Sequence, residues 1–155
     1  MRRIILPLTH LACLGIGFML GIYMLPILTA QKSPDAKEIA AASTGTEFKG
    51  RFDRNMKGSD FLHWGEGDVR LSRQRIVHEG KLSPGPDFRL YLSPEFVDTS
   101  DGFKKIKAQS KAVAEIKSYS GFIVDVPPGV DVAAFNTVVI WCEAFNVIIS
   151  AAKYR

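Results

Sequence analysis

The sequence is poor in cysteine and histidine, which argues against two common means of stabilising a small domain, namely disulfide bonds and a structural zinc ion. Its two cysteines are Cys13, in a hydrophobic N-terminal run, and Cys142, near the C-terminus. One would lie in lipid and the other in the folded domain, so no disulfide framework is expected. A structural zinc site uses four ligands, which usually include pairs close together in the sequence. His63 and His78 are 15 residues apart and provide no such pair.

A large excess of charge of either sign is also missing after the N-terminal run. Residues 45–155 carry 16 lysines and arginines against 14 aspartates and glutamates. This balance argues against a nucleic-acid partner, because such domains concentrate basic residues. One local cluster of lysines, at positions 104, 105, 107 and 111, is interpreted as a solvated face or loop. Attraction to an anionic lipid or an acidic partner is the alternative for this cluster.

Charged side chains are absent altogether from Ile4 to Leu28, a run of 25 residues. A helix of that length spans roughly 37 Å, enough for a hydrocarbon core of about 30 Å with some tilt. We therefore predict one transmembrane helix that contacts the lipid bilayer through residues 4–28. Arg2 and Arg3 precede it, which predicts a cytoplasmic N-terminus and a periplasmic or extracellular C-terminal domain. The alternative is a signal peptide cleaved after Ala30, which would export the same domain.

The rest of the chain divides by composition into a tether and one domain. Residues 1–30 form the predicted anchor or signal peptide, residues 31–46 a polar linker with about one helical turn near 35–42, and residues 47–155 a β domain. Short apolar-alternating runs between turn signals are typical of strands. They occur at 48–52, 68–72, 74–78, 88–92, 112–117, 121–126, 137–142 and 146–149. The predicted fold is all-β, a sandwich or barrel of about eight short strands behind one N-terminal transmembrane helix.

Two of these runs, 137–142 and 146–149, are continuously apolar rather than alternating. Continuous apolarity indicates that both faces of a strand are covered, so we predict that both runs are central strands. After the anchor, the sequence has no other stretch with a convincing helical period.

Cys142 is the main candidate for chemistry in the exported domain. One interpretation is a redox thiol or a thiolate ligand to haem or metal. The other is core packing, since Cys142 shares an apolar strand face with Val138 and Ile140, and an apolar site raises the pKa of a thiol. Glu143 and Asn146 follow directly, so Cys142 is near the end of its strand, where a cleft can open.

His63 is the second candidate, because the glycines that follow it leave room for a ligand; the alternative is a loop histidine beside Trp64. We interpret His78 as a surface residue and Asp87 as a turn residue. The remaining carboxylates and tryptophans lack the pattern of a calcium loop, a glycosidase pair or a sugar platform; they are Glu66, Asp68, Asp98, Asp101, Trp64 and Trp141.

Three segments, in the right order, together resemble the DM-thirteen domain family, also described as Skeletor-associated or electron-transfer domains. They are residues 63–69 (HWGEGDV), residues 85–93 (GPDFRLYLS) and residues 131–145, with TVVIWC at the centre. The resemblance covers about residues 48–152. It implies an all-β extracytoplasmic domain with a near-invariant cysteine, here Cys142, that acts as a free thiol or as a cofactor ligand in a proposed redox role.

Two hypotheses of different classes follow. In the first, the protein is a membrane-tethered redox or electron-transfer accessory domain that uses Cys142, with His63 as a cofactor-binding residue and with haem or no cofactor. Its partner would be a membrane redox protein or a surface protein. In the second, it is a non-catalytic interaction or adhesion module at the cell surface, and Cys142 is core packing. Neither hypothesis makes the chain a stand-alone enzyme, and a conventional hydrolase is a distant third, because no nucleophile-elbow pattern is present.

Overall fold

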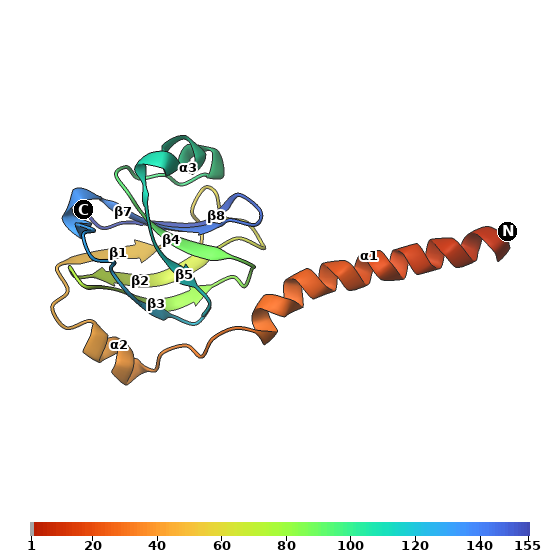
Figure 1. The fold of residues 1–155 in the computed structure, drawn as a ribbon, viewed down its shortest axis with the longest axis horizontal. Helices are drawn as coiled ribbons and strands as arrows, with labels where there is room; N and C mark the ends of the chain where they lie inside the picture. Colours follow the sequence, from red (N-terminus) through yellow and green to blue (C-terminus); the bar gives the residue numbers. More distant parts are fainter. Residues whose placement is uncertain (1) are drawn as a thin grey trace.

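The computed structural model describes residues 2–155 and consists of a long N-terminal helix followed by a β-sandwich domain (Figure 1). Helix α1 (Arg2–Leu28) projects away from one end of the domain. It is long and apolar enough to cross a membrane between Ile4 and Leu28, and a signal sequence would have the same character. The side chains of Arg2 and Arg3, on which the predicted orientation depends, lie outside the described part of the chain.

Eight strands form two antiparallel sheets of four, which confirms the prediction of an all-β fold and selects the sandwich over the barrel. The first sheet has the order β1 (Phe48–Phe52), β2 (Gly65–Leu71), β3 (Arg75–Leu82) and β6 (Phe122–Asp125). The second has the order β5 (Lys111–Ile116), β4 (Phe88–Ser93), β7 (Thr137–Cys142) and β8 (Val147–Lys153). Two short 3-10 turns, Lys107–Gln109 and Val132–Ala134, precede β5 and β7, respectively.

Strand β7 is buried on both faces, as its continuous apolar sequence predicts. Val138, Ile140 and Cys142 point into the core between the sheets. Val139 and Trp141 point the other way, where Phe103 of α3 (Ser100–Ile106) covers them. Six consecutive residues without solvent contact therefore hold this strand in a single register between β4 and β8.

The prediction that residues 146–149 form a second central strand is wrong, because β8 is the edge strand of its sheet. It is nevertheless buried over most of its length, since β1 of the other sheet lies against it. The approach is close enough that a Cβ on Gly50 would come within 2.9 Å of the Lys153 carbonyl oxygen. Burial of an edge by the opposite sheet produces the same apolar sequence as a central position.

Two short helices besides α1 have no convincing helical period in the sequence. Helix α2 (Ala36–Ala42) begins at a capping box between Asp35 and Glu38, and α3 begins at Thr99, whose side chain accepts from the Gly102 N–H. Seven residues make only two turns, which is too short for a periodic pattern to stand out. Helix α2 lies within the expected linker and packs Ile39 and Ala42 onto the domain.

The prediction that His78 is a surface residue is wrong. His78 is fully buried on β3, with its ring between those of Phe52 and Phe122 at centroid distances of 5.1 and 4.9 Å. Its Nε2–H donates to the Glu66 carbonyl oxygen at 3.0 Å, and Nδ1 has no partner among the described residues. Burial lowers the pKa of His78, although the hydrogen bond to Glu66 and the charges of Asp68 and Glu79 oppose this shift.

Acidification is expected to destabilise the protein through His78. The unfolded chain binds a proton at this ring near the ordinary pKa of 6.5, whereas the native chain does so only at lower pH. The unfolded state therefore holds more protons below about pH 6.5, and stability falls as the pH drops. At about pH 5.5 the loss is at most about 1.4 kcal/mol.

Chemical unfolding of the full chain in detergent at two pH values measures this loss. His78→Phe is the matched variant, because it keeps a ring in the stack and does not titrate. The variant should lose clearly less stability on acidification than the parent. An equal loss in both would assign the effect to another group.

Candidate functional site

Cys142 is the last residue of β7, at the end of the domain from which α1 projects. It lies opposite Phe88 on β4 and Val147 on β8, and the turn after it reverses the chain through Asn146, which has a φ of 52°. The thiol donates to the carbonyl oxygen of Pro86 at 3.1 Å, and the residue is 1% exposed. The residue thus combines burial with a position at a strand end.

Burial raises the pKa of the Cys142 thiol, and the charges of Asp87 and Glu143 raise it further. The backbone N–H groups of Ala144 and Phe145, in the turn, act in the opposite direction, because they favour a negative sulfur. The net direction is upward. At neutral pH Cys142 is therefore a protonated thiol, with less thiolate than a free cysteine has.

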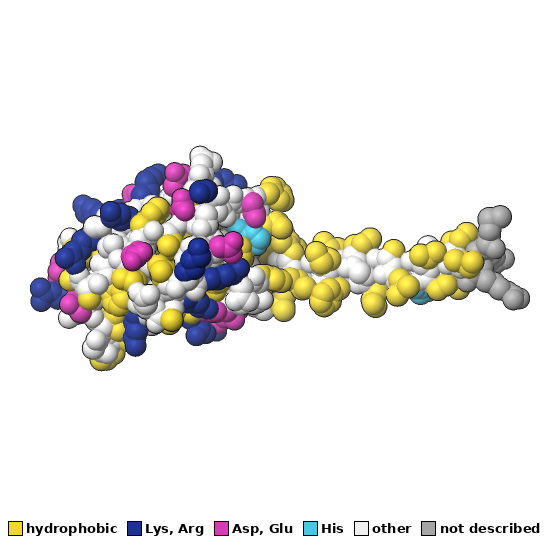
Figure 2. Space-filling view, turned by 90° about the horizontal axis from the view of Figure 1, so that it is seen from above, with side chains coloured by type: hydrophobic (Ala, Val, Ile, Leu, Met, Phe, Trp, Pro, Cys, Tyr) yellow, Lys and Arg dark blue, Asp and Glu magenta, His cyan; other side chains and the backbone are white. Residues whose placement is uncertain are grey.

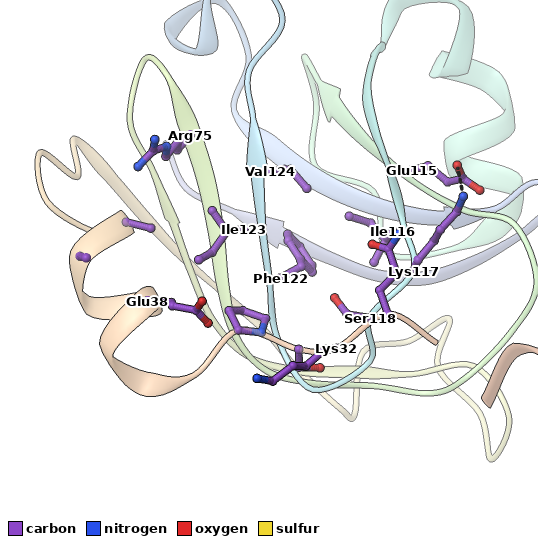
Figure 3. A pocket seen from close by; sticks show the side chains of 15 residues that line it. Lys32, Glu38, Arg75, Glu115, Ile116, Lys117, Ser118, Phe122, Ile123 and Val124 are labelled. Carbon is purple, nitrogen blue, oxygen red and sulfur yellow. Dashed lines mark ion pairs between the residues drawn. The ribbon is translucent and has the colours of Figure 1, made fainter. Parts of the chain in front are cut away.

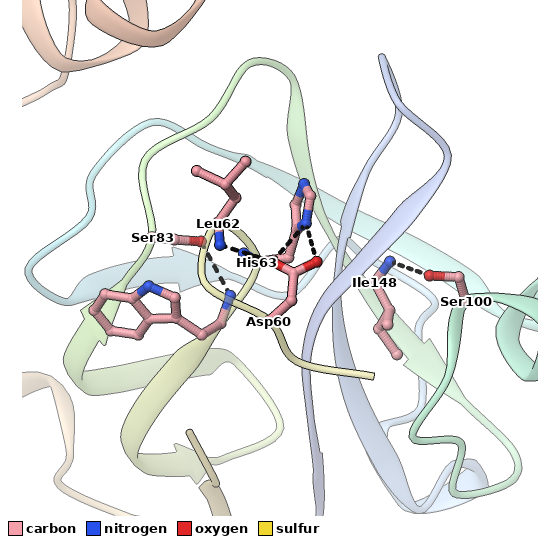
Figure 4. A network of polar contacts seen from close by, with 7 residues as sticks. Asp60, Leu62, His63, Ser83, Ser100 and Ile148 are labelled. Atoms are coloured by element: carbon pink, nitrogen blue, oxygen red, sulfur yellow. Dashed lines mark hydrogen bonds and ion pairs between the residues drawn. The ribbon is translucent and has the colours of Figure 1, made fainter. Parts of the chain in front are cut away.

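His63 lies in the loop between β1 and β2, where a single carboxylate organises the backbone (Figure 4). Asp60 accepts from the backbone N–H groups of Leu62 and His63 at 2.7 and 2.8 Å, and its other oxygen lies 2.8 Å from the Nδ1 of His63. Burial would raise the pKa of Asp60, but the hydrogen bonds from His63 and from the two N–H groups outweigh it and lower the pKa. The carboxylate is thus ionised and holds the ring in place.

The pairing with Asp60 selects one tautomer of His63. A carboxylate only accepts, so Nδ1 carries a hydrogen, and in the neutral ring Nε2 keeps the lone pair. An imidazole with Nδ1–H on a carboxylate and a free Nε2 is the arrangement that proteins use for metal-ligating histidines.

Cys142 and His63 line the same cavity, which has a volume of about 480 Å³. The rest of its domain wall is mainly apolar and includes Leu62, Phe88 and Phe145. On the remaining side, the cavity is walled by Met19, Ile22 and Tyr23 of α1. The structure therefore brings together the two residues that the sequence singled out, in a space of the size that small-molecule and cofactor sites have.

The other candidates from the sequence take structural positions. Asp87 has a φ of 52° and its carbonyl oxygen accepts from the Glu143 N–H, as fits a turn residue. Asp101 pairs with Lys104 within the first turn of α3, and Asp68 pairs with Arg51 on the surface. Within residues 2–155, no group of three or more histidine, cysteine or acidic side chains lies close enough to hold a metal ion.

Trp64 and Trp141 are also structural. Trp141 is completely buried beneath α3, and the guanidinium of Arg54 lies 3.6 Å above the ring centre of Trp64. Neither ring is therefore presented as an open platform on which a sugar could stack.

Sequence reasoning missed two features of this end of the domain. Asp60 holds His63, and only its spacing of three residues from the histidine was available as a signal. Glu143 accepts from the Tyr91 hydroxyl and pairs with Lys107 at 2.5 Å. Lys107 belongs to the lysine cluster interpreted as a solvated face, so this member is instead a half-buried ion-pair partner.

A second hollow of about 530 Å³ lies between the linker with α2 and the strands β5 and β6 (Figure 3). Its wall carries ionic groups such as Glu38 and Arg75 beside Phe122 and Ile123. None of the described residues that line it is a cysteine or a histidine. The candidate site is therefore the cavity that Cys142 and His63 line.

A protein-family model described as "Electron transfer DM13" matches residues 55–154. The match begins in the loop after β1 and runs through the end of β8, so it includes Asp60, His63 and Cys142 and leaves out α1 and α2. Comparison with the curated proteins and with the solved structures found no match.

The protonation of His63 can be tested directly. Nitrogen NMR is expected to show the Nδ1–H tautomer, because Asp60 accepts from Nδ1. Asp60→Ala should shift the ring toward the Nε2–H tautomer and lower stability by about 1 kcal/mol, since two backbone N–H groups lose their acceptor. Asp60→Asn keeps a side-chain oxygen for those N–H groups and should retain most of the stability. An unchanged tautomer in the Asp60→Ala variant would rule out this pairing.

The thiol of Cys142 is expected to react slowly in the folded protein. In a Cys13→Ser chain, where Cys142 is the remaining thiol, an aromatic disulfide reagent should react at least about tenfold more slowly in native buffer than in guanidinium, because both burial and the raised pKa reduce the available thiolate. Equal rates in the two conditions would show that the thiol is open to solvent.

Proposed function

The chain belongs to the DM13 electron-transfer domain family, and from this premise we propose that it is a membrane-anchored electron-transfer domain whose redox centre lies at Cys142. The observation that carries the proposal is the cavity that Cys142 shares with His63. This cavity is lined both by Cys142, which is the one thiol of the domain, and by the imidazole of His63, whose Nε2 is free.

The environment of Cys142 argues against thiol–disulfide exchange. Exchange needs a thiolate with access to a second sulfur. Cys142 is 1% exposed, its proton is donated to Pro86, and burial raises its pKa. A role in which the sulfur stays inside the cavity as a ligand remains open to it, because a bound metal ion displaces the proton that burial otherwise keeps on the thiol.

The residues at the cavity fit a haem in their donor chemistry. Cysteine sulfur and histidine nitrogen are both axial ligands that proteins offer to haem iron. Cys142 Sγ and His63 Nε2 would hold the group, Asp60 would orient the imidazole, and the apolar wall would exclude water. A bound haem would supply a one-electron couple that a bare thiol lacks at moderate potential.

The N-terminal helix supports anchoring at a membrane. Its uncharged stretch of 25 residues matches the thickness of a bilayer, and the side chains along it are exposed. With Arg2 and Arg3 on the cytoplasmic side, the domain would lie in the periplasm or outside the cell. We propose a membrane redox protein as the partner from which it receives, or to which it passes, electrons.

Spectroscopy and voltammetry of the purified full-length chain in detergent test the redox proposal. The haem-loaded parent protein is expected to show a visible absorption band and a reversible one-electron wave. Cys142→Ser should abolish the wave, and His63→Ala should lower cofactor occupancy at least about tenfold. The matched control is Cys13→Ser, which removes the other thiol of the chain and should leave the wave intact.

A second candidate function, a non-catalytic interaction module, is favoured by the depth of Cys142 in the core cluster with Val138 and Ile140. In that case Cys142→Ala would change stability alone. Neither a band nor a wave would be seen in any variant, and the redox proposal would be abandoned.

A further inference from the structure

Four large apolar side chains of the domain are exposed, and three of them lie at one end. Phe61 and Leu62, in the loop before β2, are 88% and 50% exposed, and Phe145, in the turn after β7, is 54% exposed. We call these three residues the apolar tip. The fourth, Phe96, is 47% exposed and follows the opposite end of β4, where Ser93 pairs with Thr137 rather than Phe88 with Cys142.

The apolar tip lies beside the N-terminal helix. Leu62 and Phe145 share the wall of the Cys142 cavity with Met19, Ile22 and Tyr23 of α1. In the space-filling view, apolar side chains run along the helix and continue onto the end of the domain from which it projects (Figure 2). Charged side chains are spread over the rest of the visible domain surface. Helix and tip thus form one continuous apolar surface.

The position of Tyr23 along the helix fixes the depth of the tip relative to a bilayer. The twenty residues from Ile4 to Tyr23 span about 30 Å, which is the thickness of a hydrocarbon core. Tyr23 then lies at the outer boundary of the core, where tyrosine is enriched in membrane proteins. The cavity is lined by Met19 and Ile22 as well as Tyr23, so the side chains that share it lie at the outer end of this span.

We infer that the apolar tip inserts into the outer interfacial layer of the membrane around α1 and holds the mouth of the Cys142 cavity against the bilayer. This inference rests on the proposed anchoring function of α1. The occupant of the surface is lipid rather than another protein, because the surface is continuous with the helix that lipid would surround. Interfacial insertion of apolar side chains by about 5–10 Å is a common mode of membrane contact.

Insertion of the apolar tip would fix the orientation of the Cys142 cavity relative to the membrane, which a flexible tether alone would not do. Residues 31 and 33 are hydrogen-bonded to the domain, through the Gln31 N–H to the Lys117 carbonyl and through the Ser120 N–H to the Ser33 hydroxyl. The connection between Leu28 and the sheet is therefore short and fixed. The cavity would face lipid and exchange ligands with the membrane rather than with bulk water.

The experiment uses the full chain with both cysteines replaced by serine and one new cysteine at a time, carrying an environment-sensitive fluorophore. Phe145→Cys and Phe61→Cys report the tip, and Phe96→Cys is the matched control of similar exposure. The protein is placed in phosphatidylcholine vesicles with nitroxide lipids labelled near the headgroup. At the tip we expect blue-shifted emission and at least about twofold stronger quenching than at position 96.

The outcomes separate this inference from the proposed anchor. Alkaline extraction and mass spectrometry of the same vesicles report whether the helix is retained. If it is retained and the tip labels resemble the label at position 96, docking is wrong and the anchor stands. If the helix is cleaved or extracted, both are wrong. A blue shift without nitroxide quenching would mean that a second copy or another protein covers the tip, which also overturns the inference.

Discussion

Burial of β7 on both faces is the constraint on which the rest of the domain depends. One face of this strand completes the core between the two sheets, and the other is closed by α3 through Phe103 and Trp141. Full burial of each large apolar side chain contributes roughly 1.5–3 kcal/mol, so a slip of β7 in either direction would lose a large share of the stability. The strand therefore has one register, and that register puts Cys142 at its end.

The position of Cys142 follows from this register, but its chemistry follows from what surrounds the strand end. The turn after β7 directs two N–H groups toward the sulfur, while burial and two nearby carboxylates oppose ionisation. The loop after β1 adds His63, held by Asp60. The rigid sheet thus positions the sulfur, and two short loops form the cavity around it. Binding sites are commonly built from loops on a rigid scaffold in this way.

The same two loops lie between the site and the N-terminal helix. They carry Leu62 and Phe145, which face both the cavity and the N-terminal helix. Because the linker is hydrogen-bonded to the domain near β5, the helix cannot swing far without breaking these contacts. Site, loops and N-terminal helix lie at one end of the molecule, and the opposite end, with Phe96, is separated from them by the length of the sheets.

The sequence by itself determined the features that depend on local pattern. A run of 25 uncharged residues specifies the apolar helix, and short alternating or continuously apolar runs specify the eight strands. Strand alternation places Cys142 on the face of Val138 and Ile140. Only the tertiary structure decided that His78 is buried, that β8 is an edge strand and that His63 shares a cavity with Cys142. These features depend on contacts between segments far apart in the chain, and such contacts leave no period or spacing in either segment.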